Sequence, residues 1–137
     1  MTANNLVAGI TSAAIPEIVP AGGIVSIDTF KQNGTAITNT NGNITLAANQ
    51  TYSVVYKANV GSQGVSMGVS TGLFLNGSII PGTNSAGTVG SNVNDSFALS
   101  GNTIITTDST ADILTLRNTS GATELFGASS ISVIKLA

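Results

Sequence analysis

Two residue types that carry much of enzyme chemistry are missing from this chain of 137 residues, which contains no cysteine and no histidine. The usual thiolate nucleophile, imidazole base and nitrogen or sulfur metal ligand are therefore absent. Only carboxylates, hydroxyls and a few lysines remain, so we expect no enzymatic activity, no cofactor and no metal site. The lack of cysteine also excludes a disulfide framework and says nothing about the redox compartment.

Charge is scarce as well. Lys, Arg, Asp and Glu make up 7% of the chain, against about 25% in ordinary soluble domains. The net charge of −2 offers no basic field for phosphates, so we expect no nucleic-acid partner. Ser, Thr, Asn and Gly fill the surface instead, and neutral groups cost less than ions to remove from water. Such a surface favours large self-association interfaces; the alternative is an extracellular domain that tolerates low charge.

Long apolar runs are also lacking. No run approaches the 18 or so residues of a membrane span, and the N-terminus has no basic region of the kind that begins a secretory signal peptide. We therefore expect neither a membrane span nor export by the standard secretory route.

What the chain does contain is the pattern of short β-strands. Residues 51–59 alternate an apolar set (Tyr52, Val54, Tyr56 and Ala58) with a mostly polar set, which predicts a half-buried strand. Residues 113–118 alternate in the same way. From residue 24 onward the sequence shows almost no helical periodicity.

Asn-Gly pairs mark the turns between these strands. Asn76-Gly77 separates two apolar runs and predicts a two-residue hairpin, because both residues accept positive φ. Together with the other turn signals it predicts an all-β antiparallel sandwich of about eight to ten strands. The other Gly-containing turn dipeptides are Asn33-Gly34, Asn41-Gly42 and Gly101-Asn102.

The first 23 residues differ from the rest, because apolar side chains there are interrupted by Pro16 and Pro20. Two prolines at that spacing exclude a stable helix or a central strand. We expect residues 1–23 to form an extended connector or anchor peptide that docks on another copy, with a disordered tail as the alternative, and residues 24–137 to form the folded domain. The predicted connector residues are Leu6, Val7, Ile10, Ile15, Ile18 and Val19.

Two features point to an interface between copies of the domain. Gly68 and Gly72 interrupt a strand pattern, which indicates either a bulge or close approach of another backbone at a trimer axis. Residues 131–136 carry apolar groups on both faces, so one face is expected to meet the core and the other a second copy. The predicted trimer-interface residues are Gly68, Gly72, Ile131, Val133, Ile134 and Leu136.

Carboxylates offer the remaining candidates for chemistry. Asp108 and Asp112 lie close in sequence, and a glycosidase or a Ca²⁺ site uses two carboxylates. A turn before a strand explains the pair better, because no Asp-x-Asp loop accompanies it. The other acidic residues are isolated, and we expect them on the solvated surface: Glu17, Asp28, Asp95 and Glu124.

Three stretches resemble the C-terminal head of the Bacillus collagen-like exosporium glycoproteins (the BclA family). They are Asn49–Asn59, the hairpin Leu73–Thr83 and the ending Ala128–Ala137, with shorter matches at residues 34–37 and 44–46. This resemblance covers about residues 30–137. It implies a tumour-necrosis-factor-like jelly roll assembled as a homotrimer on the spore surface, which a protein made inside the mother cell reaches without a secretory signal.

The N-terminal part is similar to that family's exosporium leader in Asn5–Val7 and Ile15–Gly22, although most of the leader's prolines are missing. The family's Gly-X-Y collagen stalk is absent, because no run here has Gly at every third residue. We therefore expect a subunit whose trimers join head to tail into a fibre through the N-terminal peptide, with itself as the main partner. Alternatives are a short exosporium head anchored by the leader-like segment and an adhesive, ligand-binding head. Exosporium anchor or collagen-like tip proteins are further partners to consider.

Overall fold

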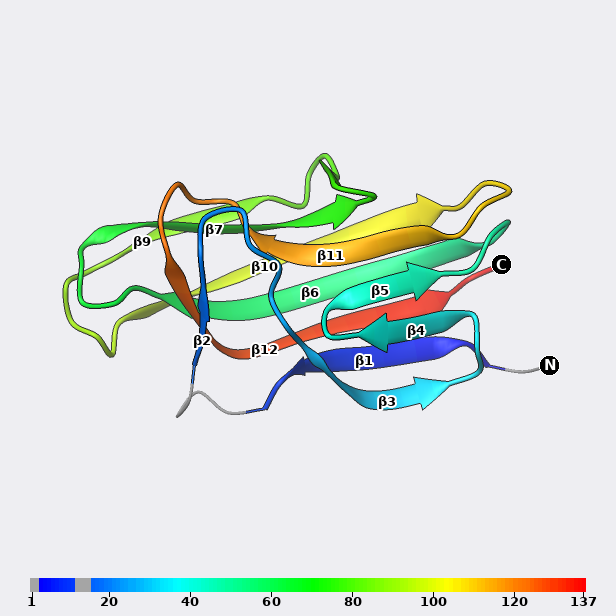
Figure 1. The fold of residues 1–137 in the computed structure, drawn as a ribbon, viewed down its shortest axis with the longest axis horizontal. Coiled ribbons are helices and arrows are strands. Elements are labelled where there is room, and N and C mark those ends of the chain that lie inside the picture. The colour runs from blue at the N-terminus through cyan, green and yellow to red at the C-terminus, as the bar shows by residue number, and fades with distance from the viewer. Residues whose placement is uncertain (1–2, 12–15) are drawn as a thin grey trace.

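The computed structural model describes residues 3–11 and 16–137, and within them every regular element is a β-strand. Two antiparallel sheets stack to form a sandwich (Figure 1). The first sheet has the order β10-β6-β12-β1-β3, with β2 added beside β12; the second has the order β4-β5-β11-β7-β8, with β9 beside β7. The strands are β1 (Asn5–Ile10), β2 (Glu17–Val19), β3 (Asp28–Asn33), β4 (Ile37–Thr40), β5 (Asn43–Leu46), β6 (Thr51–Gly61), β7 (Met67–Leu75), β8 (Ser78–Ile79), β9 (Ser85–Val89), β10 (Ser96–Thr106), β11 (Asp112–Asn118) and β12 (Glu124–Lys135).

The core lies between the two sheets. From the first sheet, β6 contributes the predicted apolar set, and all four of its side chains are buried. From the second sheet, β11 contributes Leu114 and Leu116, which are also buried. The period-two alternation therefore predicted correctly which face of each strand points into the core. Among the described residues there is no helix long and apolar enough to cross a membrane.

The hairpin between β7 and β8 turns at Asn76-Gly77, as predicted, with φ angles of 50° and 84°. The Asn76 side chain also ties the turn to β11. Its Nδ2 donates to Asp112 Oδ1 at 2.8 Å, and its Oδ1 accepts from the Ile113 backbone N–H at 2.8 Å. The Asp112 carboxylate thus stabilises the hairpin turn, while Asp108 lies in the turn before β11.

The turn predicted at Gly101-Asn102 is wrong, because both residues lie inside β10. A Cβ on Gly101 would lie 2.7 Å from Cε1 of Tyr56 and 2.9 Å from the Thr83 carbonyl oxygen. The glycine is needed for this packing and not for a turn. The uninterrupted β10 is therefore 11 residues long and forms one edge of the first sheet.

The N-terminal segment belongs to the sandwich. β1 lies between β12 and β3, pairing from Asn5↔Ile134 to Ile10↔Ser129. β2 pairs with β12 between Pro16 and Pro20, so the prolines flank this short strand and interrupt neither β1 nor β2. The predicted division at residue 23 therefore does not match the fold, which has 12 strands among its described residues instead of the expected eight to ten.

Candidate self-association surface

The face of the first sheet that points away from the core is named here the outer face. It consists of the alternate side chains of β10, β6, β12 and β1 that do not enter the core. Strand register aligns them in rows across the sheet. The three rows across the first three strands are Ile104, Ser53, Ile134; Asn102, Val55, Ser132; and Ser100, Lys57, Ser130.

Three aliphatic side chains gather on the outer face. Ile104 is 66% exposed, Val55 52% and Ile134 50%. Ile104 and Ile134 both lie opposite Ser53, and Val55 belongs to the adjacent row. Their neighbours are mostly Ser and Asn, so covering this area removes apolar surface from water without desolvating many charged side chains.

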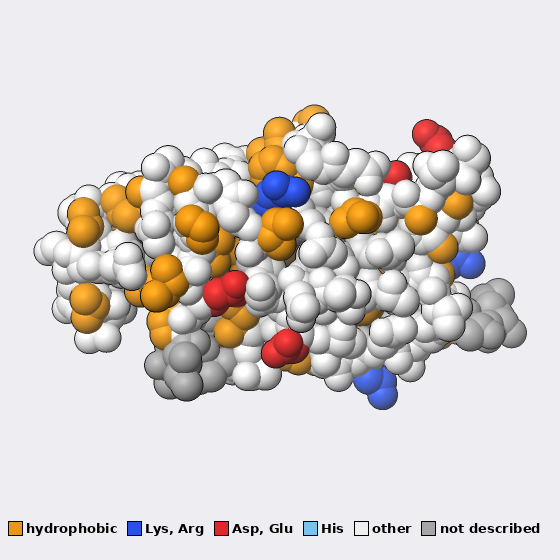
Figure 2. Space-filling view, viewed as in Figure 1, with side chains coloured by type: hydrophobic (Ala, Val, Ile, Leu, Met, Phe, Trp, Pro, Cys, Tyr) orange, Lys and Arg blue, Asp and Glu red, His pale blue; other side chains and the backbone are white. Residues whose placement is uncertain are grey.

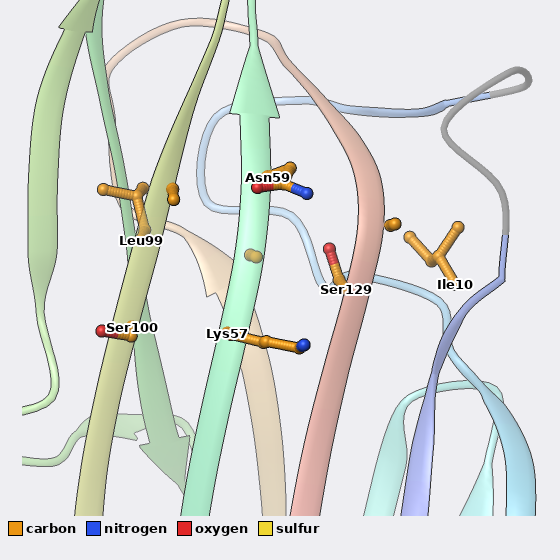
Figure 3. A pocket seen from close by; sticks show the side chains of 9 residues that line it. Ile10, Lys57, Asn59, Leu99, Ser100 and Ser129 are labelled. Atoms are coloured by element: carbon orange, nitrogen blue, oxygen red, sulfur yellow. The ribbon is translucent and has the colours of Figure 1, made fainter.

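A hollow of about 300 Å³ opens on the same face, farther along β6. Leu99 and Ser100 of β10, Lys57 and Asn59 of β6, Ser129 of β12 and Ile10 of β1 line it, and Figure 3 shows the Lys57 side chain extending from β6 toward β12. Its lining combines one cation with hydroxyl, amide and aliphatic groups.

The opposite layer shows the same shortage of charge. On the face seen in Figure 2, the acidic and basic side chains are few and stand apart from one another. Arg117 on β11 lies over the ring of Phe74, with its Cζ 5.0 Å from the ring centroid. The shortage of charge in the composition therefore holds on this face as well as on the outer face.

The structure separates the predicted connector residues. Leu6 and Val19 fill the core of their own chain, while Val7 and Ile10 are half-buried. Ile18 is exposed on β2. Ile15 lies outside the described residues. The connector role of this segment stays a prediction, now for strands that are also part of their own sheet.

The predicted trimer-interface residues are divided between layers. Ile131 and Val133 point into the core, whereas Ile134 and Leu136 are exposed. Gly68 and Gly72 lie on β7 in the second sheet. A Cβ on Gly72 would lie 3.2 Å from Cδ1 of Ile79, a side chain of its own chain.

Sequence reasoning missed Val55 and Ile104 as surface apolar residues. Val55 occupies a position in the mostly polar set of its strand, and its aliphatic side chain was itself a signal. Ile104 was obscured by the turn expected at Gly101-Asn102. Once β10 is continuous, Ile104 is the exposed neighbour of buried Ile105.

Glu124 contradicts the expectation of a solvated carboxylate, because it is fully buried at the start of β12. Its Oε1 accepts from the Ser70 backbone N–H of β7 at 2.6 Å, which links the two sheets, and its Oε2 is buried without a hydrogen-bond partner. Burial raises the pKa of Glu124, as it does that of half-buried Glu17. No group of three or more Asp or Glu side chains among the described residues could hold a metal ion.

Glu124 should make stability fall as pH rises. Its pKa in the fold is raised above the ordinary 4.5, so the folded chain holds this proton more tightly than the unfolded chain. The resulting stabilisation is complete below pH 4.5 and is lost as pH rises through the folded pKa. Urea unfolding between pH 4 and 8 should show this slope, and Glu124→Gln should reduce it to the part that Glu17 contributes; an equal slope in Glu124→Gln would contradict the assignment. Asp108→Asn is the exposed control.

Solved structures share this fold over almost the whole chain. The structure is similar to murine APRIL, with a TM-score of 0.72 and 11% identity over 97% of this chain and 99% of that chain. It is similar to the Eiger tumour necrosis factor of S. frugiperda, with a TM-score of 0.63 and 15% identity over 98% and 94%. It is also similar to the globular domain of zebrafish complement 1qA protein, with a TM-score of 0.59 and 10% identity over 97% and 95%.

These likenesses define the fold as a tumour-necrosis-factor-like jelly roll, which confirms the predicted all-β architecture. No family model and no curated protein sequence matches the chain.

Proposed function

We propose that the chain is a non-enzymatic structural subunit that forms a homotrimer through the outer face. The observation that carries this proposal is the exposed aliphatic cluster of Ile104, Val55 and Ile134, set among neutral side chains on one sheet face. Isolated surface leucines or isoleucines are ordinary, but adjacent ones on a face with little charge indicate an interface. The trimeric state is what the resemblance to the exosporium heads implies.

The two ends of the sandwich support a further step, in which trimers join head to tail. Both termini lie at one end (Figure 1), where the Lys135 N–H donates to the Asn4 carbonyl at 3.0 Å. The loops after β6 and β9 lie at the opposite end and expose Val65 and Val93. Contacts between opposite ends stack the trimers along one axis, where they do not close into a ring, so they propagate into a filament.

The N-terminal segment is the proposed link between trimers, and the spore surface is the proposed location. The location is supported by the resemblance to the exosporium glycoproteins. Because β1 is a strand of its own sheet, a link through this segment requires copies to exchange β1 or to contact one another through the residues beside it. Strand exchange keeps every backbone pairing and supplies main-chain hydrogen bonds between copies.

Sedimentation and electron microscopy of the full-length chain test both levels of the proposal. We expect a particle of three times the 13.6 kDa chain mass at micromolar concentration, and filaments as concentration rises. A monomer at all concentrations would contradict the trimer. Isolated trimers without filaments would contradict the head-to-tail step alone and favour a head held at the spore surface by its N-terminus.

A further inference from the structure

Lys57 is the one charged residue that the described strands β10, β6, β12 and β1 place on the outer face, while the adjoining edge strand β3 carries Asp28 in the same row and Lys31 in the next. In its row Lys57 lies between Ser100 of β10 and Ser130 of β12, and it is exposed. Among the described residues its side chain makes no hydrogen bond or ion pair. If trimer formation covers this face, the ammonium group loses water, and an unpaired charge in that position costs several kcal/mol. The neighbouring copy must therefore supply a carboxylate.

Most acidic residues cannot fill that role. Glu17 and Glu124 each accept a backbone N–H bond within their own chain and keep a buried oxygen. Asp112 accepts from Asn76 on the second sheet. Asp108 lies in the turn between β10 and β11, at the end that carries the termini (Figure 1). The remaining candidates are Asp28, on β3, and Asp95, immediately before β10.

The two free edges of the first sheet distinguish these candidates. The β3 edge carries Asp28 and Lys31, and charges on an edge strand oppose pairing or packing with another chain. The β10 edge contains no charged residue over its 11 positions and exposes Phe97 and Ile104. A closed ring of three copies needs a contact between two different patches. The uncharged β10 edge is therefore the better partner for the outer face, and Asp95 lies at the start of this edge strand.

Asp95 is placed to reach another copy. It ends the exposed loop between β9 and β10, and its carboxylate makes no hydrogen bond or ion pair within the described chain. The loop backbone is held against β6, because a Cβ on Gly61 would lie 2.7 Å from the Asp95 carbonyl oxygen. Asp95 lines a second hollow of about 270 Å³ that shares Asn59 with the hollow of Lys57. Among the described residues, the face thus has the Lys57 ammonium group on β6 and the Asp95 carboxylate at its β10 side, neither with a partner in its own chain.

We propose that Asp95 of each copy pairs with Lys57 of the next copy around the trimer. This inference rests on the proposed self-association through the outer face. Each subunit then pairs its Asp95 with one neighbour and its Lys57 with the other, so all three lysines of the trimer are neutralised. A pair of this kind fixes the register of an interface whose other contacts are aliphatic or neutral.

Charge reversal tests the pairing. Lys57→Glu and Asp95→Lys should each weaken association at least about 30-fold, because each leaves like charges together in a desolvated site. The double variant Lys57→Glu/Asp95→Lys restores opposite charges and should return association to within about threefold of the unaltered protein. Lys31→Glu, on the charged β3 edge, is the matched control and should change association little. Sedimentation equilibrium at 0.15 M salt measures all five proteins, and circular dichroism confirms that each is folded.

Three results would contradict the proposed pairing. An unaltered protein that is monomeric refutes the proposed trimer and the pairing with it. An unaltered trimer whose single variants associate normally overturns the pairing alone. Weak association in both single variants without rescue in the double variant also overturns it, because both residues would then contact partners other than each other.

Discussion

A chain lacking residues 1–19 should be unfolded, although it retains the whole of the predicted domain, residues 24–137. The deletion removes β1 and β2, and with them Leu6, Ala8 and Val19 from the core. Loss of one buried leucine side chain alone costs about 2–5 kcal/mol, and a whole domain is stable by only about 5–15 kcal/mol. The deletion also leaves β12 and β3 without the strand that joins them. Circular dichroism and amide exchange should show loss of the cooperative fold.

A synthetic peptide of residues 1–19 provides the control, because it should restore the fold when added in excess to the shortened chain. Its Gly9→Ala version should not, since a Cβ on Gly9 would overlap the backbone oxygen of Ser129 on β12. A shortened chain that unfolds at the same urea concentration as the full chain would show that β1 is dispensable. Rescue by the peptide would also show that β1 can be supplied by a separate chain, as exchange between trimers requires.

Ile104→Asp should convert the trimer to a folded monomer. The side chain is 66% exposed in the single chain, so the substitution should change the free energy of unfolding of one subunit little. In the trimer it would place three carboxylates in a desolvated contact, each costing several kcal/mol without a partner. The sedimentation mass should fall to the 13.6 kDa of one chain.

Ile113→Asp is the matched control for this experiment. Ile113 is 44% exposed and lies on β11 in the second sheet, away from the outer face. Its substitution should leave the trimer intact. If both variants remain trimeric, or if only Ile113→Asp dissociates, the interface lies elsewhere. The pair therefore tests which sheet associates, independently of the Lys57 pairing.

Local patterns were sufficient to predict those parts of the fold that depend on a single strand or turn. The alternation in β6 and the Asn76-Gly77 hairpin are decided by side-chain period and backbone φ, and both are as expected. The fold class followed from repeated signals of this kind. Gly101 was misread because a glycine required by the Tyr56 ring has the same sequence appearance as a turn glycine.

Properties that depend on distant partners could not be predicted in this way. β1 is a central strand because β12 and β3 flank it, and no local feature of residues 5–10 names those partners. Glu124 is buried because its Oε1 meets the Ser70 N–H across the sandwich. Four of the six predicted interface residues lie in the core or in the second sheet for the same reason. The sequence showed the spacing of these residues but not which layer of the sandwich they face.

The position of β1 between two antiparallel neighbours has a mechanical consequence for a fibre. If tension between trimers is carried by this strand, the force acts along its axis, while its hydrogen bonds to β12 and β3 run across it. The bonds of both ladders are then loaded in shear and share the force, instead of opening one after another as in a zipper. In the proposed fibre, the six residues of β1 would therefore resist a force directed along the strand.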